Sequence, residues 1–428
     1  MQITEDLLYY IWKFRYYDFN QLATTSMETI EIVDPGNRNP HSGPDFLLAK
    51  IKINNQLWVG NVEIHVNASD WGLHQHESDR AYNNVILHVV WNQDKEVKNS
   101  AGLVLPSLEL KSRVNPNLIA TYSYLMENQS WVPCEKSIGN TSDITRHSWL
   151  QRLMAERLEH KSKRILLDLE SNNGDWESVC YQKLARALGG KVNNDPMEML
   201  SRITPLNIIQ KHRDYLLQIE ALLYGQSGLL DTLESDDEYP QKLRREFQFL
   251  QKKYDLKALN PVQWKFLRMR PANFPTIRIA QLARILYQTD HLFSKFLSAK
   301  NTKEIVHMLD VTVSHYWKNH YSFKSESSAR EKHLGKDTIS TIIINTVAPL
   351  LFAYGISIDN EQYKEKAVDF LSELKPEKNS IISGWTNIGW MANTAMDSQA
   401  LIELKNNFCD QKRCIACSIG HQLLKSKL

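Results

Sequence analysis

The stretch from His41 to Trp91 constrains the fold of this chain most, because three β-strand patterns follow one another within it. Residues 46–53 are apolar with two lysines interleaved, residues 58–66 alternate between apolar and polar side chains, and residues 85–91 are β-branched and apolar. Each pattern is typical of a strand, so we expect a β-sheet in the first part of the chain.

Side chains that bind metal ions are concentrated in the same stretch. Its histidines and acids include His41, His65, His74, His76, His88, Asp45, Glu63, Asp70, Glu77 and Asp79. Asp45 follows a Gly-Pro turn where the first strand begins. Glu63 and His65 are two residues apart on the second strand, so their side chains point to the same face of the sheet.

Two carboxylates and one imidazole from neighbouring strands can hold one divalent cation. Mg²⁺ or Mn²⁺ suits the oxygens of Asp45 and Glu63, and the ring of His65 favours Mn²⁺ or Zn²⁺. A further candidate group of ligands comprises His74, His76 and Asp79. In the alternative interpretation Asp45 caps a turn, Glu63 pairs with a lysine, and the histidines are ordinary surface or core residues.

A basic stretch lies between Gln241 and Asp290. It contains eleven Lys or Arg residues against three acids, a local balance of +8. Two prolines in its centre exclude a continuous helix, so we expect a rigid loop between two helices. The loop arginines Arg268, Arg270 and Arg278 are candidates for binding phosphate groups. The alternative is a solvated basic helix face, with loop arginines that pair with acids of the same domain.

Three cysteines are close together near the C-terminus, in the spacing Cys409-x4-Cys414-x2-Cys417. This spacing is typical of a zinc or iron–sulfur site. Such a site needs a fourth ligand, for which His421 would suit zinc and Cys134 would suit either metal. The alternative is a set of free thiols in a helical domain.

Beyond residue 145 the pattern changes to amphipathic helices. Helical spacing of apolar residues predicts helices at 148–170, 195–203, 205–223, 239–254, 278–287 and 339–354, and Asp175 and Gly189–Gly190 mark the ends of another. With 428 residues, 42% of them hydrophobic, the chain can form two domains. We expect an α+β protein with an α/β domain at 1–144, built on a mixed sheet, and a larger, mostly helical domain at 145–428.

Charge, hydropathy and cysteine content favour a soluble protein of the cytoplasm. A net charge of +2 is too balanced to indicate nucleic-acid binding by itself. No run of about 18 apolar residues is present, and the first residues predict an amphipathic helix rather than a signal peptide, so we expect no membrane association. The cysteine pattern does not resemble a disulfide framework.

The motifs Pro44-Asp45 and Glu63-Ile64-His65 resemble the signature of the restriction-endonuclease-like superfamily, PD followed by (D/E)XK. The expected order of a helix, a strand, the two strands with the motifs, a helix and a further strand also resembles that superfamily. The resemblance implies a nuclease-like mixed sheet over about the first 110 residues. His65 replaces the lysine that orients the attacking water, which implies either a variant nuclease or a fold that has lost its activity.

A second resemblance covers nearly the whole chain. The segments SGPDF, VGNVEIH, RMRPANFP and CDQKRCIAC are similar to a family of bacterial proteins of unknown function. This resemblance implies no activity.

The sequence therefore predicts a divalent-metal-dependent phosphodiester hydrolase that acts on nucleic acid. Asp45 and Glu63 would bind Mg²⁺ or Mn²⁺, His65 would orient or deprotonate the water, and Arg268 and Arg270 would hold phosphate. Two alternatives remain open. One is a non-catalytic module that binds nucleic acid or a protein partner. The other is a metal-binding protein whose site at His74, His76 and Asp79 has no hydrolytic function.

Overall fold

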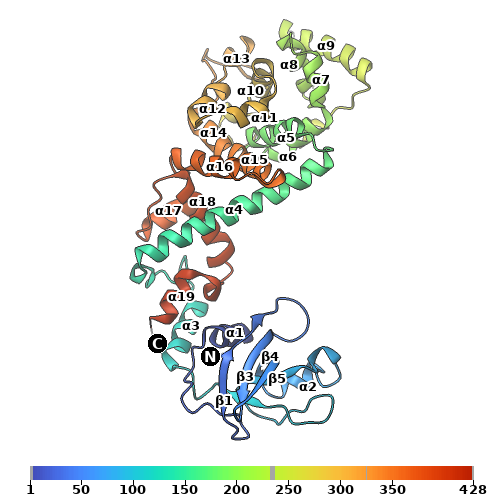
Figure 1. Ribbon diagram of the computed structural model, residues 1–428. Helices are drawn as coiled ribbons and strands as arrows, with labels where there is room; N and C mark the ends of the chain where they lie inside the picture. The colour runs from blue at the N-terminus through green and yellow to red at the C-terminus, as the bar shows by residue number, and fades with distance from the viewer. Residues whose placement is uncertain (1–2, 232–236, 324, 427–428) are drawn as a thin grey trace. The chain divides into compact units, whose positions relative to one another are not determined.

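The computed structural model describes residues 3–231, 237–323 and 325–426, and the chain divides into two compact units (Figure 1). The first unit comprises residues 1–149 and 404–428, and the second comprises residues 150–403. The boundary between the two units lies after Trp149, four residues from the domain boundary expected near residue 145. The C-terminal segment, which the sequence-based division placed in the helical domain, belongs to the first unit because it packs against the helices of that unit.

A mixed sheet forms the centre of the first unit, and the protein is α+β as expected. The strands are β1 (Ile30–Asp34), β2 (Asn37–Arg38), β3 (Phe46–Ile53), β4 (Gln56–Asn67), β5 (Val85–Asn92) and β6 (Ser107–Glu109). They follow the order β1-β3-β4-β5-β6, and β2 pairs with β3. The pairs β1/β3 and β3/β4 are antiparallel, whereas β4/β5 and β5/β6 are parallel. The three predicted strands correspond to β3, β4 and β5.

The other elements of the first unit are helices and helical turns. They are α1 (Glu5–Phe14), α2 (Asp70–Leu73), α3 (Pro116–Glu127), the first turns of α4 (Asp143–Ser171), α19 (Ser418–Lys425), the 3₁₀ turns η1 (Arg80–Tyr82), η2 (Ile138–Asn140) and η7 (Cys414–Ala416), and the π-helical turn η6 (Lys405–Cys409). Helix α1 lies against the sheet (Figure 1), and its Leu7, Leu8 and Ile11 are fully buried. The helix that was expected between the strands now seen as β4 and β5 includes the turn η1, where the Asp79 carboxylate accepts a hydrogen bond from the N–H of Ala81.

The second unit is helical. Its elements are the rest of α4, α5 (Trp176–Leu188), α6 (Asn194–Ile203), α7 (Leu206–Lys211), α8 (Leu216–Gln226), α9 (Glu238–Tyr254), α10 (Pro275–Gln288), α11 (Leu292–Ser298), α12 (Thr302–Leu309), α13 (Tyr316–Asn319), α14 (Lys336–Ile342), α15 (Ala348–Ser357), α16 (Glu361–Glu373), α17 (Ser380–Asn387) and α18 (Ala395–Leu404). Shorter pieces are η3 (Pro261–Gln263), η4 (Pro271–Asn273), the π-helical turn η5 (Ile343–Val347), and the hairpin of β7 (His320–Ser322) and β8 (Ser325–Glu326).

Helix boundaries in this unit follow local side-chain chemistry. Asp175 caps α5 as predicted, and its Oδ1 accepts hydrogen bonds from the N–H groups of Glu177 and Ser178 (3.0 and 3.2 Å). The single helix predicted at 205–223 is instead α7 followed by α8. The break lies at His212, whose ring nitrogens are hydrogen-bonded to Gln218 and Tyr254 (2.8 and 2.9 Å). Tyr254 is the last residue of α9, so a contact with a residue far along the chain accompanies the break in the helical pattern.

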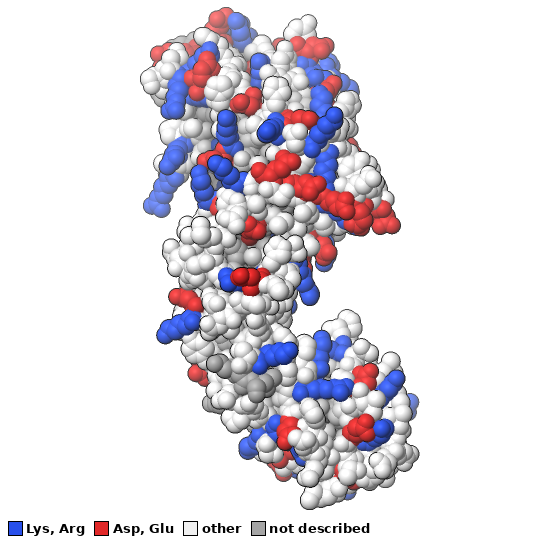
Figure 2. All heavy atoms as spheres, turned by 60° about the vertical axis from the view of Figure 1, so that its left-hand side comes forward, with Lys and Arg blue, Asp and Glu red and all other residues white. Residues whose placement is uncertain are grey.

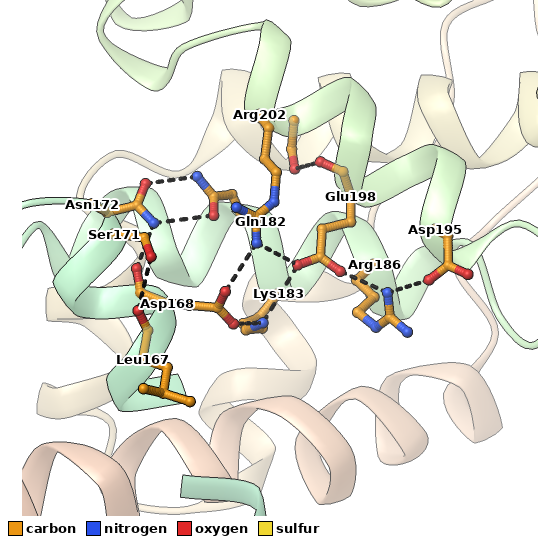
Figure 3. A network of polar contacts seen from close by, with 11 residues as sticks. Leu167, Asp168, Ser171, Asn172, Gln182, Lys183, Arg186, Asp195, Glu198 and Arg202 are labelled. Atoms are coloured by element: carbon orange, nitrogen blue, oxygen red, sulfur yellow. Dashed lines mark hydrogen bonds and ion pairs between the residues drawn. The ribbon is translucent and has the colours of Figure 1, made fainter. Parts of the chain in front are cut away.

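A network of charged side chains ties α4, α5 and α6 together (Figure 3). Glu198 of α6 accepts hydrogen bonds from Arg186 (2.6 Å) and Arg202 (3.0 Å) and lies 3.5 Å from the ammonium of Lys183. Lys183 also pairs with Asp168 of α4. Because Glu198 and Lys183 are both buried, this network satisfies charges that would otherwise destabilise the core.

Acidic and basic side chains are intermixed on the part of the second unit seen in Figure 2. Residues of the basic stretch form ion pairs with residues outside it. Lys242 pairs with Glu238 (2.6 Å), and Asp290 pairs with Arg213 (3.1 Å) and Lys295 (2.5 Å). The helical run Lys336–Ser357 is long and apolar enough to cross a membrane, but 72% of its most apolar window is buried inside the unit. Burial of this kind is expected of a core helix.

Candidate metal centre

Asp45 and Glu63 face each other across the β3/β4 pair. Phe46 pairs with Val62 in the antiparallel register, which places Asp45 opposite Glu63. The N–H of Asp45 donates to Oε2 of Glu63 (3.0 Å), and Oδ2 of Asp45 accepts from the N–H of Ile64 (3.0 Å). The two carboxylates are buried, with 8% and 5% of their residues' surface exposed. Each carboxylate therefore lies beside the backbone of the opposite strand segment.

Three histidine rings lie beside Glu63. His65, His74 and His76 each offer one ligand atom, and these atoms all lie within 4.8 Å of one another. Nε2 of His65 is 3.2 Å from Nδ1 of His74 and 3.6 Å from Oε1 of Glu63. Nε2 of His76 is 3.3 Å from the same Oε1. The three ring nitrogens are therefore close enough to share one cation, and Oε1 of Glu63 lies beside two of them.

The loop after α2 brings His74 and His76 together. Between them Gln75 adopts a left-handed backbone conformation, with φ of 60°. This turn allows the ring centroids of His74 and His76 to lie 5.4 Å apart. The ring of His76 also stacks on that of Tyr82, with 3.8 Å between centroids. His76 is buried, and its Nε2 has no hydrogen-bond partner among the described residues. An unpartnered buried nitrogen is a suitable metal ligand, because binding a cation would satisfy its lone pair.

Burial favours the uncharged forms of His65, His76 and Glu63. It lowers the pKa of His65 to about 2, with smaller contributions from His88, His76 and His74, and it lowers the pKa of His76. Burial and the neighbouring Asp45 raise the pKa of Glu63 to about 9. Neutral imidazoles are the form that binds metals, so the rings of His65 and His76 are in the form that a cation requires.

His88 holds the ring of His65 in place. Its Nε2 lies 2.9 Å from Nδ1 of His65, and its ring is fully buried. If Nδ1 of His65 donates to His88, the lone pair of His65 Nε2 points toward His74 and Glu63. A partner of this kind fixes the tautomer of a metal-binding histidine. The sequence showed His88 as one of several histidines but not this role.

Two side chains of α1 and one of β2 complete the surroundings of Asp45. The hydroxyl of Tyr9 donates to Glu5 (3.3 Å), and the guanidinium of Arg38 pairs with Oδ1 of Asp45 (3.0 Å) while lying 3.8 Å from the Tyr9 ring centroid. Burial and the charge of Asp45 raise the pKa of Glu5. Sequence reasoning missed these residues. The signal was the spacing of Glu5 and Tyr9, which are one helical turn apart on a helix with acids at its start.

Asp79, which was expected beside His74 and His76, has a different position. Its Oδ1 accepts a hydrogen bond from the N–H of Ala81 (2.9 Å), and it is exposed. It is not part of the three-histidine group. The capping role accounts for an aspartate at this point of the chain.

The three loop arginines of the second unit are not equivalent. Arg268 and Arg270 are exposed, and Arg268 has φ of 58°. Arg278 is buried, and its guanidinium donates to Gln281 (2.8 Å) and Asn273 (2.7 Å). It stabilises the start of α10 and is not free to bind phosphate.

The C-terminal cysteines Cys409, Cys414 and Cys417 belong to the first unit, together with Cys134. None of them forms a disulfide. The other candidate ligand, His421, has both ring nitrogens near tyrosine hydroxyls, of Tyr10 (3.1 Å) and Tyr16 (3.3 Å).

Comparison with known proteins identifies a family but no activity. Residues 5–380 match a family described as "Protein of unknown function (DUF2851)". The terminal cysteine motif lies beyond the matched range. No curated protein and no solved structure matches the chain significantly. Because the match covers most of the chain, the protein belongs to the DUF2851 family.

Proposed function

We propose that this protein is a divalent-metal-dependent hydrolase that cleaves phosphodiester bonds in nucleic acid. The observation that carries the proposal is the group of His65, His74 and His76, with ligand atoms within 4.8 Å of one another, next to the buried carboxylate of Glu63. Perturbed titratable groups gathered in one place are typical of catalytic sites.

The spacing of the ligand atoms favours a transition metal. Four ligands at 2.0–2.1 Å around a tetrahedral ion lie about 3.3 Å apart. The separation of 3.2 Å between Nε2 of His65 and Nδ1 of His74 agrees with this spacing. Imidazole ligands suit Zn²⁺ or Mn²⁺, whereas Mg²⁺ prefers oxygen. The ligand set proposed from the geometry therefore differs from the expected pair of carboxylates with Mg²⁺.

Glu63 has the position of a general base. A cation held by the three rings would lower the pKa of a bound water and polarise a phosphate oxygen. Oε1 of Glu63 lies 3.3 and 3.6 Å from two of the ring nitrogens, so it can accept a proton from that water. Asp45 orients Glu63 through its backbone N–H, and Arg38, one-third exposed, can approach a phosphate anion from the solvent side.

The order of elements supports a phosphodiester as the substrate. Helix α1, strands β1, β3 and β4, the turns α2 and η1, and strand β5 follow the order that the resemblance to the restriction-endonuclease-like superfamily implies. Asp45 directly precedes β3 and Glu63 lies on β4, which is the arrangement that the two motifs imply. His65 takes the place of the motif lysine and is a metal ligand in this proposal. Arg268 and Arg270 would add contacts to the nucleic-acid backbone.

The test combines metal analysis with cleavage assays on the full-length protein. Zn²⁺ and Mn²⁺ binding is measured by calorimetry, and hydrolysis is measured on single-stranded DNA, duplex DNA, RNA and bis(p-nitrophenyl) phosphate. His74→Ala removes an exposed ligand and should weaken metal binding. Glu63→Gln should keep the metal and lower the cleavage rate by about 10²–10⁴-fold. His41→Ala, an exposed histidine of the same stretch, is the matched control and should change neither.

Other outcomes would contradict the proposal in distinct ways. Stoichiometric metal binding without cleavage of any of the four substrates would favour a metal-binding protein. Salt-dependent binding of nucleic acid without cleavage would favour a non-catalytic module, and Arg268→Ala should then weaken that binding with little sequence dependence. Cleavage that survives Glu63→Gln would exclude the assigned base.

A further inference from the structure

Four cysteines of the first unit come from two segments that are far apart in the sequence. Cys134 lies in the turn that follows α3, and its carbonyl oxygen accepts a hydrogen bond from the N–H of Ile138 (2.8 Å). Cys409 ends η6, Cys414 begins η7, and Cys417 precedes the first residue of α19. Because α19 packs against α3 and η2, both segments belong to one packed region.

The C-terminal segment has a tightly fixed backbone around its cysteines. The N–H of Cys417 donates to the carbonyl oxygen of Cys414 (3.2 Å), and the N–H of Lys412 donates to that of Cys409 (3.1 Å). A Cβ atom at Gly420 would lie 2.0 Å from the carbonyl oxygen of Cys414. Only glycine allows η7 to approach the first turn of α19 this closely. The three cysteines are therefore held in position by the fold.

Two lysines that flank Cys409 join the C-terminal segment to the region of Cys134. Nζ of Lys412 donates to the carbonyl oxygen of Met126 in α3, and the ammonium of Lys405 lies 5.2 Å from the ring centroid of Trp131, three residues before Cys134. Cys134, Cys414 and Cys417 are buried, Cys409 is partly buried, and all four are free thiols. Four thiols in one packed region are the ligands that zinc and iron–sulfur sites use.

Positive charges lie beside the same cysteines. Lys405 and Lys412 flank Cys409 in the chain, and Arg413 directly precedes Cys414. Positive charges near the sulfurs are features that tune iron–sulfur clusters.

We propose that Cys134, Cys409, Cys414 and Cys417 bind an iron–sulfur cluster. Sulfurs bound at about 2.3 Å to one tetrahedral zinc ion would lie roughly 3.8 Å apart. Among the residues that the structure describes, the group whose ligand atoms lie within 4.8 Å of one another is the histidine group, so no three of these sulfurs are that close. A cluster distributes its thiolates over more than one iron and therefore suits a wider spacing.

The cluster would fasten the C-terminal segment to the turn after α3. It would join residues that are hundreds of positions apart, and closing so long a loop reduces the conformational freedom of the unfolded chain. The proposed site is independent of the histidine centre, since it shares no residue with it.

The experiment is anaerobic purification of the full-length protein with chemical analysis of bound iron, acid-labile sulfide and zinc. We expect a brown protein with iron and sulfide in equal amounts and a broad visible absorption band that bleaches on reduction. Cys134→Ala and Cys417→Ala should each lose most of the iron and sulfide. Cys180→Ala, which removes a buried cysteine of the second unit, is the matched control and should retain both.

Hydrogen exchange separates loss of the cluster from failure to fold. In Cys134→Ala, amides of residues 404–428 should exchange faster, while β3, β4 and the second unit keep their protection. A colourless protein with stoichiometric zinc would overturn the proposal. So would a protein without bound metal after anaerobic purification and reconstitution with iron and sulfide, or full iron content in Cys134→Ala.

Discussion

Replacing Glu198 by Gln should destabilise the second unit in a pH-dependent way. The substitution keeps the size of the side chain and removes the charge at the centre of the network in Figure 3. Burial by itself would raise the pKa of this carboxylate. The hydrogen bond from Arg202 and the charges of Lys183 and Arg186 outweigh it and lower the pKa from 4.5 to about 2.

The size of the effect follows from this difference in pKa. At about 1.36 kcal/mol per pKa unit it corresponds to roughly 3 kcal/mol of folding free energy at neutral pH. Arg202 and Arg186 are 42% and 27% exposed, and solvent screening at these partners reduces the expected loss to about 2–3 kcal/mol. For a unit of this size the melting temperature should fall by about 5–10 °C.

The sign of the pH dependence is fixed by the lowered pKa. The charged carboxylate contributes its full stability above its unfolded pKa of 4.5, and this contribution is lost as the pH falls toward about 2. Thermal unfolding of wild type and Glu198→Gln, followed by circular dichroism near pH 7 and near pH 3, measures this contribution. The difference in unfolding free energy between the two proteins should be less than half as large at pH 3 as at pH 7.

The control is Glu238→Gln, which removes a largely exposed carboxylate that pairs with Lys242, and which should leave the melting temperature unchanged at both pH values. Equal stability of wild type and Glu198→Gln at pH 7 would refute the reasoning. A difference of the same size at pH 3 would also refute it, because the effect would then not come from the charge.

Three further predictions concern single side chains. Gly225→Ala should destabilise the second unit by about 1–3 kcal/mol in urea unfolding, because the added Cβ would lie 2.0 Å from the ring of Phe247; an unchanged midpoint would mean that α9 can move aside. Asp175→Ala should lower the free energy of unfolding in urea by about 1 kcal/mol, because the N-terminal cap of α5 is lost. Asp175→Asn, which can still cap the helix, should keep most of the wild-type stability. His88→Ala should weaken Zn²⁺ binding by about 10–100-fold in calorimetry, and an unchanged affinity would exclude His88 as the residue that positions His65.

Local patterns in the sequence predicted the strands β3, β4 and β5 and the common face of Glu63 and His65. A strand has a side-chain period of two, so the pattern of 46–53 matches β3 and the spacing of Glu63 and His65 places both on one face. Asp175 was predicted as a cap because capping depends on a few neighbouring residues. The interpretation of 205–223 as one helix was wrong. The helix is interrupted after Lys211, and the ring of His212 contacts Tyr254 at the end of α9, a contact that no local pattern reveals.

The sequence by itself determined which residue types are available: carboxylates and imidazoles in one stretch, and three cysteines in another. Only the tertiary structure decided which of them meet. The backbone turn at Gln75 brings His74 and His76 close to His65. Asp79 instead caps a turn, and Arg278 is buried and hydrogen-bonded within the second unit. The return of the C-terminal segment to the first unit places Cys134 in the same packed region as Cys409, Cys414 and Cys417. Proximity of this kind depends on long-range packing, because the free energy of burying distant segments together is not encoded in any short stretch of the chain.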